Sequence, residues 1–221
     1  MPQIWAESIE QHKRQTIARI IDATVALVAD KGLGATSMSQ VAVRSGIGRA
    51  TLYSYFPDVE HILLAWHEQE VDRYRESLSR ELARQSDTPG ALRIIITRLI
   101  EGFTGGHDHA LDASRVELSA LSPQIKQQMA GASAKLATLL DEVLEHGIRT
   151  GQLRPDLNRE LTTTLIVRAA SAAREQVEQG HGDATQVADA VLALLLGGVQ
   201  PPPEPQRRAS APRRQARTSR S

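Results

Sequence analysis

The chain has 221 residues, with 26 basic and 26 acidic side chains and no cysteine. This length is enough for one large or two small domains with a hydrophobic core. The lack of cysteine excludes disulfides, zinc–thiolate sites and cysteine catalysis. No apolar run reaches the roughly 18 residues that a membrane span needs, and the N-terminus lacks the pattern of a secretory signal. We therefore expect a cytoplasmic protein.

The first predicted helix runs from about Ser8 to Lys31, because its apolar residues recur at steps of three and four, and Gly32 ends it. Residues 36–56 then predict two short helices joined by a tight turn. Ser37 or Ser39 can cap the first of them, and Gly46 supplies the backbone freedom that the turn requires.

The second short helix begins at about Gly48 and separates two kinds of side chain. Leu52 and Phe56 lie four residues apart on one line, which we assign to the core. Polar-tipped residues occupy the other lines and can face outward; they are Arg49, Thr51, Tyr53 and Tyr55. No acidic residue occurs between Lys31 and Asp58 to repel phosphate. This pattern is typical of a helix-turn-helix whose second helix enters the major groove of DNA.

The same stretch resembles the N-terminal domain of TetR-family transcriptional regulators. The resemblance is carried, in order, by Ile20-Ile21-Asp22-Ala23, Ala29-Asp30-Lys31-Gly32, Ala35-Thr36-Ser37-Met38 and Leu52-Tyr53-Ser54-Tyr55-Phe56-Pro57. Two positions depart from the family pattern. Val28 stands where an aromatic residue is usual, and Val59 stands where a phosphate-contacting lysine is common, so that one backbone contact is absent or made elsewhere.

Together, the residue pattern and the resemblance predict a set of DNA-binding residues within a domain spanning residues 1–57. They are Thr36, Ser37, Arg44, Arg49, Thr51, Tyr53 and Tyr55. Because one short helix reads few base pairs, two copies placed about one DNA turn apart on a palindrome are expected. The predicted partners are thus double-stranded DNA and a second copy of the chain.

The remainder, residues 58–198, predicts a further series of helices and no strands. Long helices are expected after Pro57-Asp58, from Thr88-Pro89 until Gly105-Gly106, after Ser122-Pro123, from Asp156 or Asn158 to about Gln179, and from Asp183 to Gly197-Gly198. A short helix is expected around Arg115 to Leu121. The prediction is an all-α protein of about nine helices, in which this second part binds an effector and forms the dimer.

The last two helices carry the predicted dimer interface. Small residues give one helix a flat surface, and the other has a broad apolar face, so two such pairs can close a four-helix bundle between subunits. The interface residues are predicted to be Ala169, Ala172, Ala173, Val187, Val191, Leu194 and Leu195. The alternative is that this face packs only on its own protomer. The family resemblance implies the dimer.

The resemblance also implies an effector cavity between about Asp87 and Arg149. Its candidate lining residues are Leu99, Phe103, Arg115, Leu118 and Arg168. The scarcity of aromatic residues there favours an aliphatic or small ligand, and Arg115 or Arg168 can pair with a ligand carboxylate. The same apolar residues can equally be a solid core, and both arginines can be surface residues.

Residues 199–221 predict a disordered tail, because they are rich in proline and nearly devoid of large apolar side chains. The part from Pro201 onward holds six arginines against one glutamate, so the rest of the chain is net acidic. This tail either adds a salt-sensitive attraction to DNA or is solvated without a role.

Other classes of protein are less well supported by the sequence. His107-Asp108-His109 lacks the spacing of a metal site, and no catalytic or nucleotide-binding motif is present. We therefore predict no enzyme activity, no metal and no cofactor. The preferred interpretation is a homodimeric repressor that releases a palindromic operator when a small molecule binds. The alternative is a ligand-independent, architectural DNA-binding protein, for which a solid second domain would argue, whereas a cavity above roughly 300 Å³ would argue for a sensor.

Overall fold

The computed structural model describes residues 2–102 and 120–199, and these residues form helices and connections without strands. The helices are α1 (Pro2–Lys31), the 3₁₀ turn η1 (Leu33–Ala35), α2 (Met38–Ser45), α3 (Arg49–Tyr55), α4 (Val59–Leu82), α5 (Thr88–Glu101), α6 (Pro123–Arg149), α7 (Arg159–Glu178) and α8 (Ala184–Val199). The all-α prediction is confirmed, and about nine helices was approximately right.

Helix starts coincide with polar residues that accept hydrogen bonds from the first turn. Such side chains satisfy backbone N–H groups that have no partner within the helix. The observed pairs are Asp58 with the N–H of His61 (2.9 Å), Asp87 with Gly90 (2.7 Å), Ser122 with Ile125 (3.5 Å) and Asn158 with Leu161 (3.0 Å). These caps confirm the predicted starts of four helices and decide for Asn158 over Asp156.

Two helix ends differ from the prediction. The first helix begins at Pro2 rather than Ser8. The fifth ends at Glu101, before Gly105-Gly106, because Gly102 adopts a φ of +72° and terminates it. The positive φ favours glycine at this position, and a Cβ there would lie 2.8 Å from a guanidinium nitrogen of Arg174 and would displace that side chain. The predicted short helix at 115–121 and the tail from residue 200 lie wholly or largely outside the described residues.

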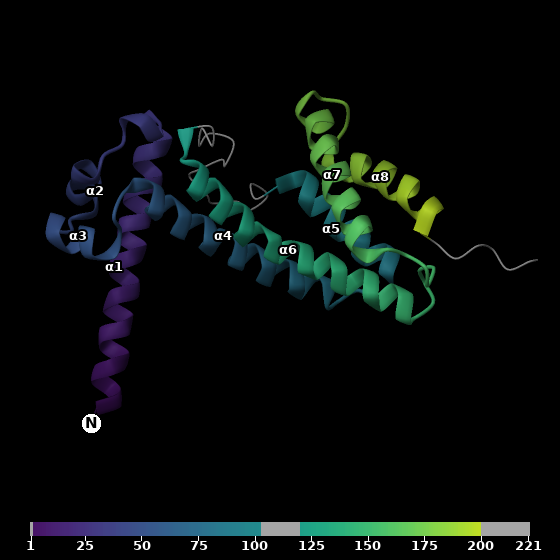
Figure 1. The fold of residues 1–221 in the computed structure, drawn as a ribbon, viewed down its shortest axis with the longest axis horizontal. Coiled ribbons are helices and arrows are strands. Elements are labelled where there is room, and N and C mark those ends of the chain that lie inside the picture. Colours follow the sequence, from purple (N-terminus) through teal and green to yellow (C-terminus); the bar gives the residue numbers. More distant parts are fainter. Residues whose placement is uncertain (1, 103–119, 200–221) are drawn as a thin grey trace, which may run out of the picture.

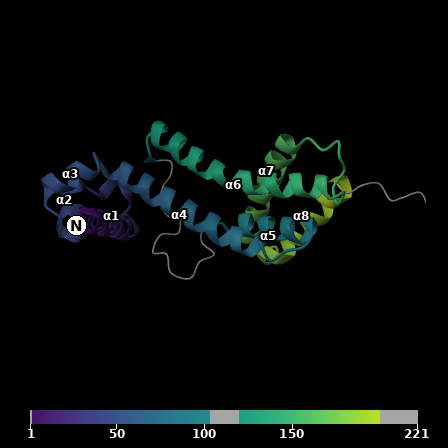
Figure 2. The same ribbon diagram turned by 90° about the horizontal axis from the view of Figure 1, so that it is seen from below.

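The helices divide into a head and a bundle (Figure 1). The head contains α1, α2 and α3, and the N-terminal end of α1 projects away from it. The bundle contains α5, α7 and α8, and α4 connects the two. Helix α6 packs along α4 in the same direction, so that both begin near the head (Figures 1 and 2). Two parallel helices therefore link the head to the bundle.

Two hydrophobic cores correspond to these parts. The head core includes buried Ile20, Val41, Leu52 and Phe56. It also includes residues beyond the predicted domain boundary at 57: Val59, Ile62 and Leu63 of α4, and Leu121, Ile125 and Met129 at the beginning of α6. Among the described residues, the buried apolar side chains of the bundle core are leucine, isoleucine and alanine. No helix in the described ranges is long and apolar enough to cross a membrane.

Candidate nucleic-acid interface

The turn between α2 and α3 is held by a side chain from α1. Gly46 adopts a left-handed φ of +66°, and the N–H of Ile47 donates to the carbonyl of Ala42 at 3.2 Å. Arg19 donates from Nη2 to the carbonyl of Ser45 at 2.6 Å, which satisfies an acceptor at the end of α2 and places positive charge where the helix dipole favours it. The position of α3 relative to α2 is therefore fixed by α1.

Helix α3 has the two faces that its sequence predicts. Leu52 is fully buried and Phe56 closes the core beneath it. Arg49, Thr51 and Tyr53 are exposed, and about half of the surface of Tyr53 is accessible. Tyr55 differs, because it is half-buried and packs against the head core. The available reading surface of α3 is thus centred on Arg49, Thr51 and Tyr53.

The beginning of α2 is capped within its own first turn. Both the N–H and the hydroxyl of Ser37 donate to Oε1 of Gln40, at 3.0 Å each. The hydroxyl of Thr36 donates to the carbonyl of Gly32 at 2.9 Å. Ser37 is exposed and Thr36 half-buried. The predicted role of these two residues in binding DNA stays a prediction, and for either hydroxyl to donate to a phosphate it must first release its present acceptor.

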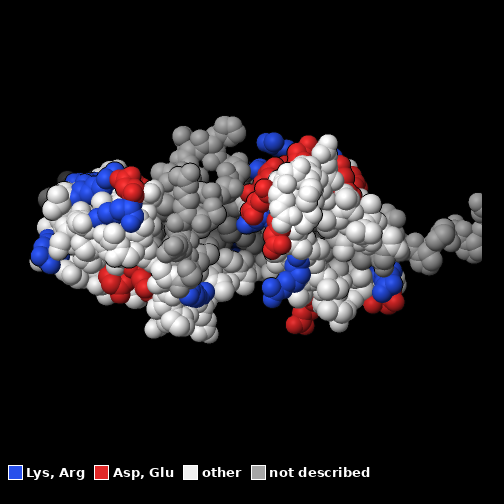
Figure 3. All heavy atoms as spheres, turned by 90° about the horizontal axis from the view of Figure 1, so that it is seen from above, with Lys and Arg blue, Asp and Glu red and all other residues white. Residues whose placement is uncertain are grey.

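Arg44 is paired with an acidic residue on the head surface. Its Nη1 lies 3.1 Å from Oδ2 of Asp30 at the end of α1, and both side chains are largely exposed. The segment 32–57 has no acidic residue, but the fold brings Asp30 of α1 next to Arg44 of this segment. Figure 3 shows red patches beside the blue ones on the head. If Arg44 contacts phosphate as predicted, Asp30 is a competing partner for its guanidinium.

Replacing Asp30 with asparagine is therefore expected to strengthen DNA binding. The change removes the carboxylate that pairs with Arg44 and leaves a guanidinium free to neutralise phosphate. The gain should be a few-fold at physiological salt, since exposed ion pairs are worth about 0.2–1 kcal/mol, and it should shrink as salt rises. Fluorescence anisotropy with a labelled duplex measures both effects.

Asp22→Asn is the matched control, because Asp22 is an exposed aspartate of the same helix. The control also removes one negative charge, but it leaves the Arg44 pair intact. If both variants strengthen binding equally, net charge is responsible and Asp30 has no specific effect on Arg44.

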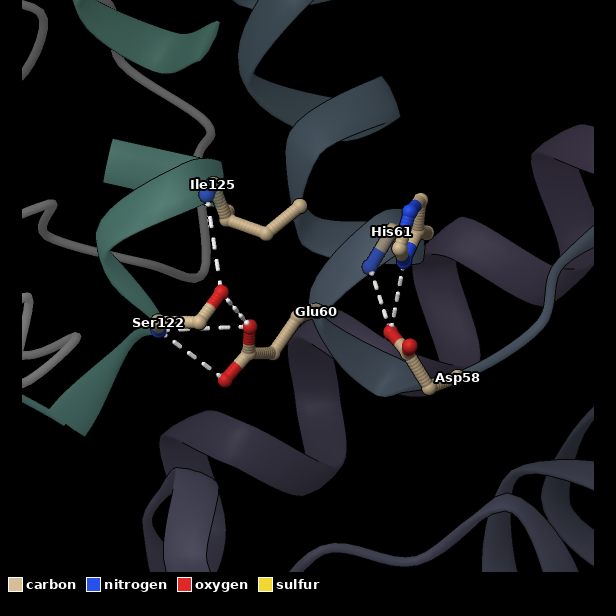
Figure 4. A network of polar contacts seen from close by, with 5 residues as sticks. All are labelled: Asp58, Glu60, His61, Ser122 and Ile125. Carbon is tan, nitrogen blue, oxygen red and sulfur yellow. Dashed lines mark hydrogen bonds and ion pairs between the residues drawn. The ribbon is translucent and has the colours of Figure 1, made fainter. Parts of the chain in front are cut away.

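The head is joined to the beginning of α6 by a polar contact (Figure 4). Glu60, in the first turn of α4, accepts hydrogen bonds from the N–H of Ser122 at 3.2 Å and from its hydroxyl at 2.5 Å. The Ser122 oxygen in turn caps α6. Asp58 caps the start of α4 next to this contact. Burial acts to raise the pKa of Asp58, but hydrogen bonds from His61 outweigh it and hold that pKa below its usual range. Glu60 thus ties the two long helices together where they leave the head.

A second contact joins the same helices about two to three turns further along. Nε2 of His67 lies 3.2 Å from the carbonyl of Met129 and 3.1 Å from the Ser133 hydroxyl. Since a carbonyl only accepts, this nitrogen carries a proton in the contact. Burial lowers the pKa of His67, which favours the neutral ring. Helices α4 and α6 are therefore held together by polar contacts at two places near the head.

The predicted ligand-binding residues are not brought together by the described structure. Phe103, Arg115, Leu118 and the segment His107-Asp108-His109 lie outside it. Leu99 is half-buried against the bundle core, whereas Arg168 is exposed. An open groove of about 320 Å³ lies where α4 ends and α5 begins, beside α6, and neither Leu99 nor Arg168 lines it. No group of residues in the described ranges could hold a metal ion.

Arg174 is the arginine that faces the inside of the bundle, and the sequence analysis missed it. Its Nε donates to the carbonyl of Ile100 at 3.2 Å and its Nη2 to that of Leu99 at 2.6 Å. The guanidinium thereby caps the end of α5. Tyr74 packs near this core, and its burial raises the pKa of the phenol well above its usual value. In the sequence, Gly102 was a sign of this contact, because a glycine leaves space for the Arg174 guanidinium at the end of α5.

The predicted dimer residues fall into two groups. Ala172 and Leu194 are exposed, and Leu194 retains 82% of its surface. Ala173 is buried in the core of its own protomer, and the half-buried Val187, Val191 and Leu195 also pack against that core. Ala169 is half-buried. Leu161 and Leu165 are additional exposed apolar residues that the analysis did not include.

Known proteins are similar to the head in sequence and to most of the chain in fold. Residues 20–66 match the family model described as bacterial regulatory proteins, tetR family. The chain is 22% identical to the fatty acid metabolism regulator protein of Bacillus subtilis over 86% of this chain and 98% of that protein. It is 27% identical to the transcriptional repressor KstR2 of Rhodococcus jostii, over 83% and 90%. The structure of the regulator FadR from Bacillus subtilis in complex with stearoyl-CoA superposes with a TM-score of 0.67 at 23% identity, covering 83% of this chain and 99% of that chain.

Proposed function

We propose that the chain, which belongs to the TetR family of bacterial regulatory proteins, is a homodimeric transcriptional repressor. A small molecule is proposed to release it from a palindromic operator. The observation that carries this proposal is the head, in which Arg49, Thr51 and Tyr53 lie exposed on a helix whose opposite side is buried. Two heads related by a two-fold axis suit a palindromic site. The proposal places the protein in the cytoplasm and gives it no enzymatic activity, as expected of a regulator.

We propose that the effector is a thioester of coenzyme A with an aliphatic acyl chain. In the described ranges the buried apolar side chains of the bundle core are all aliphatic, which suits an alkyl chain better than a planar ring. The inward guanidinium of Arg174 supplies positive charge at the edge of that core. A solved structure of the same fold holds stearoyl-CoA, and a curated relative is named for fatty acid metabolism.

Operator release tests this effector class directly. A palindromic duplex is first selected from a random pool, and its binding is then measured with stearoyl-CoA, butanoyl-CoA or free coenzyme A present. Stearoyl-CoA is expected to weaken DNA binding by roughly 5- to 150-fold, the usual range of coupling between two sites. Free coenzyme A should have no effect. Tight DNA binding that no acyl-CoA changes would favour the alternative, a ligand-independent DNA binder.

The coupling between ligand and DNA is proposed to run through α4 and α6. Their first turns are tied by Glu60 and Ser122, and Ile125 and Met129 of α6 lie in the head core. Residues further along α6, such as Leu140 and Leu144, lie in the bundle core. A ligand that displaces α6 within the bundle therefore moves the head, and with it the separation of the two reading helices.

Replacing Glu60 with alanine is expected to weaken this coupling. The change removes the acceptor for the N–H and hydroxyl of Ser122, so near the head α6 is coupled to α4 only through the His67 contact and apolar packing. Stearoyl-CoA should then bind as before, but its effect on operator affinity should fall severalfold. Titrations of ligand onto protein and of protein onto operator, with and without ligand, measure the two quantities.

Asp72→Ala is the matched control. It removes another contact between the same helices, the exposed pair of Asp72 with Lys135 at 3.3 Å, which lies further from the head. This variant is expected to keep the full response. An undiminished response in Glu60→Ala would show that the tie does not transmit the ligand signal.

A further inference from the structure

Arg19 of α1 lies at the turn that leads into the reading helix. Thr16 and Ile20, on either side of it in the chain, are buried, so the position of α1 beside the turn is fixed by packing. Nη2 of Arg19 donates to the carbonyl of Ser45 at 2.6 Å. A Cβ at Gly46 would lie 3.0 Å from the same nitrogen. The guanidinium therefore lies against the backbone of the turn, close to where α3 begins.

This contact leaves most of the guanidinium available. A guanidinium has five N–H donors, and the Ser45 carbonyl is the acceptor that it has among the described residues. A carbonyl is neutral, so the positive charge of Arg19 is not compensated by this bond. Arg44 differs, because it is paired with the carboxylate of Asp30. Arg19 is also exposed, so its remaining donors can reach a partner outside the protein.

The surroundings of this guanidinium suit an anion. The segment 32–57, which contains the turn and both short helices, has no acidic residue. Arg49, the first residue of α3, is exposed and adds a second positive charge to the same part of the head. Asp22, one turn further along α1, makes no ion pair with Arg19 among the described residues. A backbone phosphate of DNA is an anion that arginine binds through two N–H groups.

We propose that Arg19 binds a phosphate of the DNA backbone while it holds the turn. This inference rests on the proposed DNA-binding function and adds to it a contact from outside α2 and α3. Nη2 stays on the Ser45 carbonyl, and the remaining N–H groups donate to phosphate oxygens. Because one side chain makes both contacts, the phosphate is bound with α3 in the orientation that the turn gives it. Contacts to phosphate fix the orientation of a protein on the duplex in this way.

Removing the charge tests the contact through counterion release. On a palindromic duplex selected from a random pool, Arg19→Gln should make the slope of log affinity against log salt less steep by about 0.9 for each head, or roughly 1.8 for the dimer. At about 0.15 M salt, the affinity should fall by roughly fivefold for each head. Arg19→Lys keeps the charge and should keep the slope. Fluorescence anisotropy at several salt concentrations measures both quantities.

The partner phosphate can be located from the DNA side. Phosphates of the duplex are replaced one at a time by neutral methylphosphonates, which leaves the protein unchanged. One replacement in each half-site is expected to weaken binding of the wild type severalfold but to have almost no effect on Arg19→Gln, because that variant has no contact there to lose. If Arg19 only supports the fold, every replacement should weaken the two proteins equally.

Arg14→Gln is the matched control, since Arg14 is an exposed arginine of the same helix and lies about 140° around its axis from Arg19. It should leave the slope unchanged. Circular dichroism and the melting temperature check folding, and Arg19→Met is a second neutral variant should Arg19→Gln fail to fold. An unchanged slope in the folded neutral variant, or an equal change in Arg14→Gln, would overturn the phosphate contact. A wild-type protein that binds no selected duplex would instead refute the proposed function.

Discussion

Replacing Leu194 with aspartate is expected to give folded monomers that have lost operator affinity. Leu194 retains 82% of its surface in the protomer, so a charge there costs the isolated fold little. In the proposed dimer the same position is covered, and two buried carboxylates would face apolar surface without partners. The dimer dissociation constant should rise by at least roughly a hundredfold, which corresponds to about 2.7 kcal/mol.

Loss of the dimer also removes the second reading head. Operator affinity should therefore fall to that of one head on a half-site, while the helical circular dichroism signal is retained. Ile9→Asp is the control, because Ile9 is an exposed apolar residue of α1, outside the bundle. Sedimentation should show intact Ile9→Asp dimers and Leu194→Asp monomers. If Leu194→Asp remains dimeric, the covered surface excludes α8.

Local interactions explain why much of the fold was predictable. A capping side chain acts within three residues of the helix start, so Asp58, Ser122 and Asn158 reveal helix starts from sequence alone. The alternation of Leu52 with Arg49 and Tyr53 similarly separates the buried and exposed faces of α3. Features of this kind depend on neighbours in the chain and need no knowledge of the tertiary packing.

Contacts between distant segments explain what the sequence analysis missed. Arg168 and Arg174 lie on the same helix, and only the packing of α7 against α5 turns Arg174 inward to the end of α5. In the same way, Asp30 reaches Arg44 because α1 packs on α2. The tie between Glu60 and Ser122 spans 62 residues. Such pairings arise from tertiary structure, and no local pattern encodes them.

Replacing Arg49 with alanine is expected to weaken operator binding strongly without unfolding the head. Arg49 is the first residue of α3 and is exposed, so its guanidinium can reach a guanine edge or a phosphate. A lost bidentate contact to guanine costs about 1–3 kcal/mol, or roughly 5- to 150-fold in affinity for each such contact. Because the dimer carries two heads, the effect on a palindrome should be greater than on a half-site.

Measuring how the DNA affinity of Arg49→Ala depends on salt and on DNA sequence shows whether Arg49 contacts a base edge or a phosphate. If Arg49 binds a base edge, Arg49→Ala should lose discrimination at one position of each half-site and bind other DNA nearly as well as before. If it binds phosphate, affinity should fall for all sequences alike, and the slope of log affinity against log salt should decrease by about one for each contact. Arg14→Ala is the control, since Arg14 is an exposed arginine of α1 away from the reading helix. If Arg49→Ala and Arg14→Ala lower operator affinity equally, the loss of one positive charge explains both effects. The proposed position of α3 on the DNA would then be wrong.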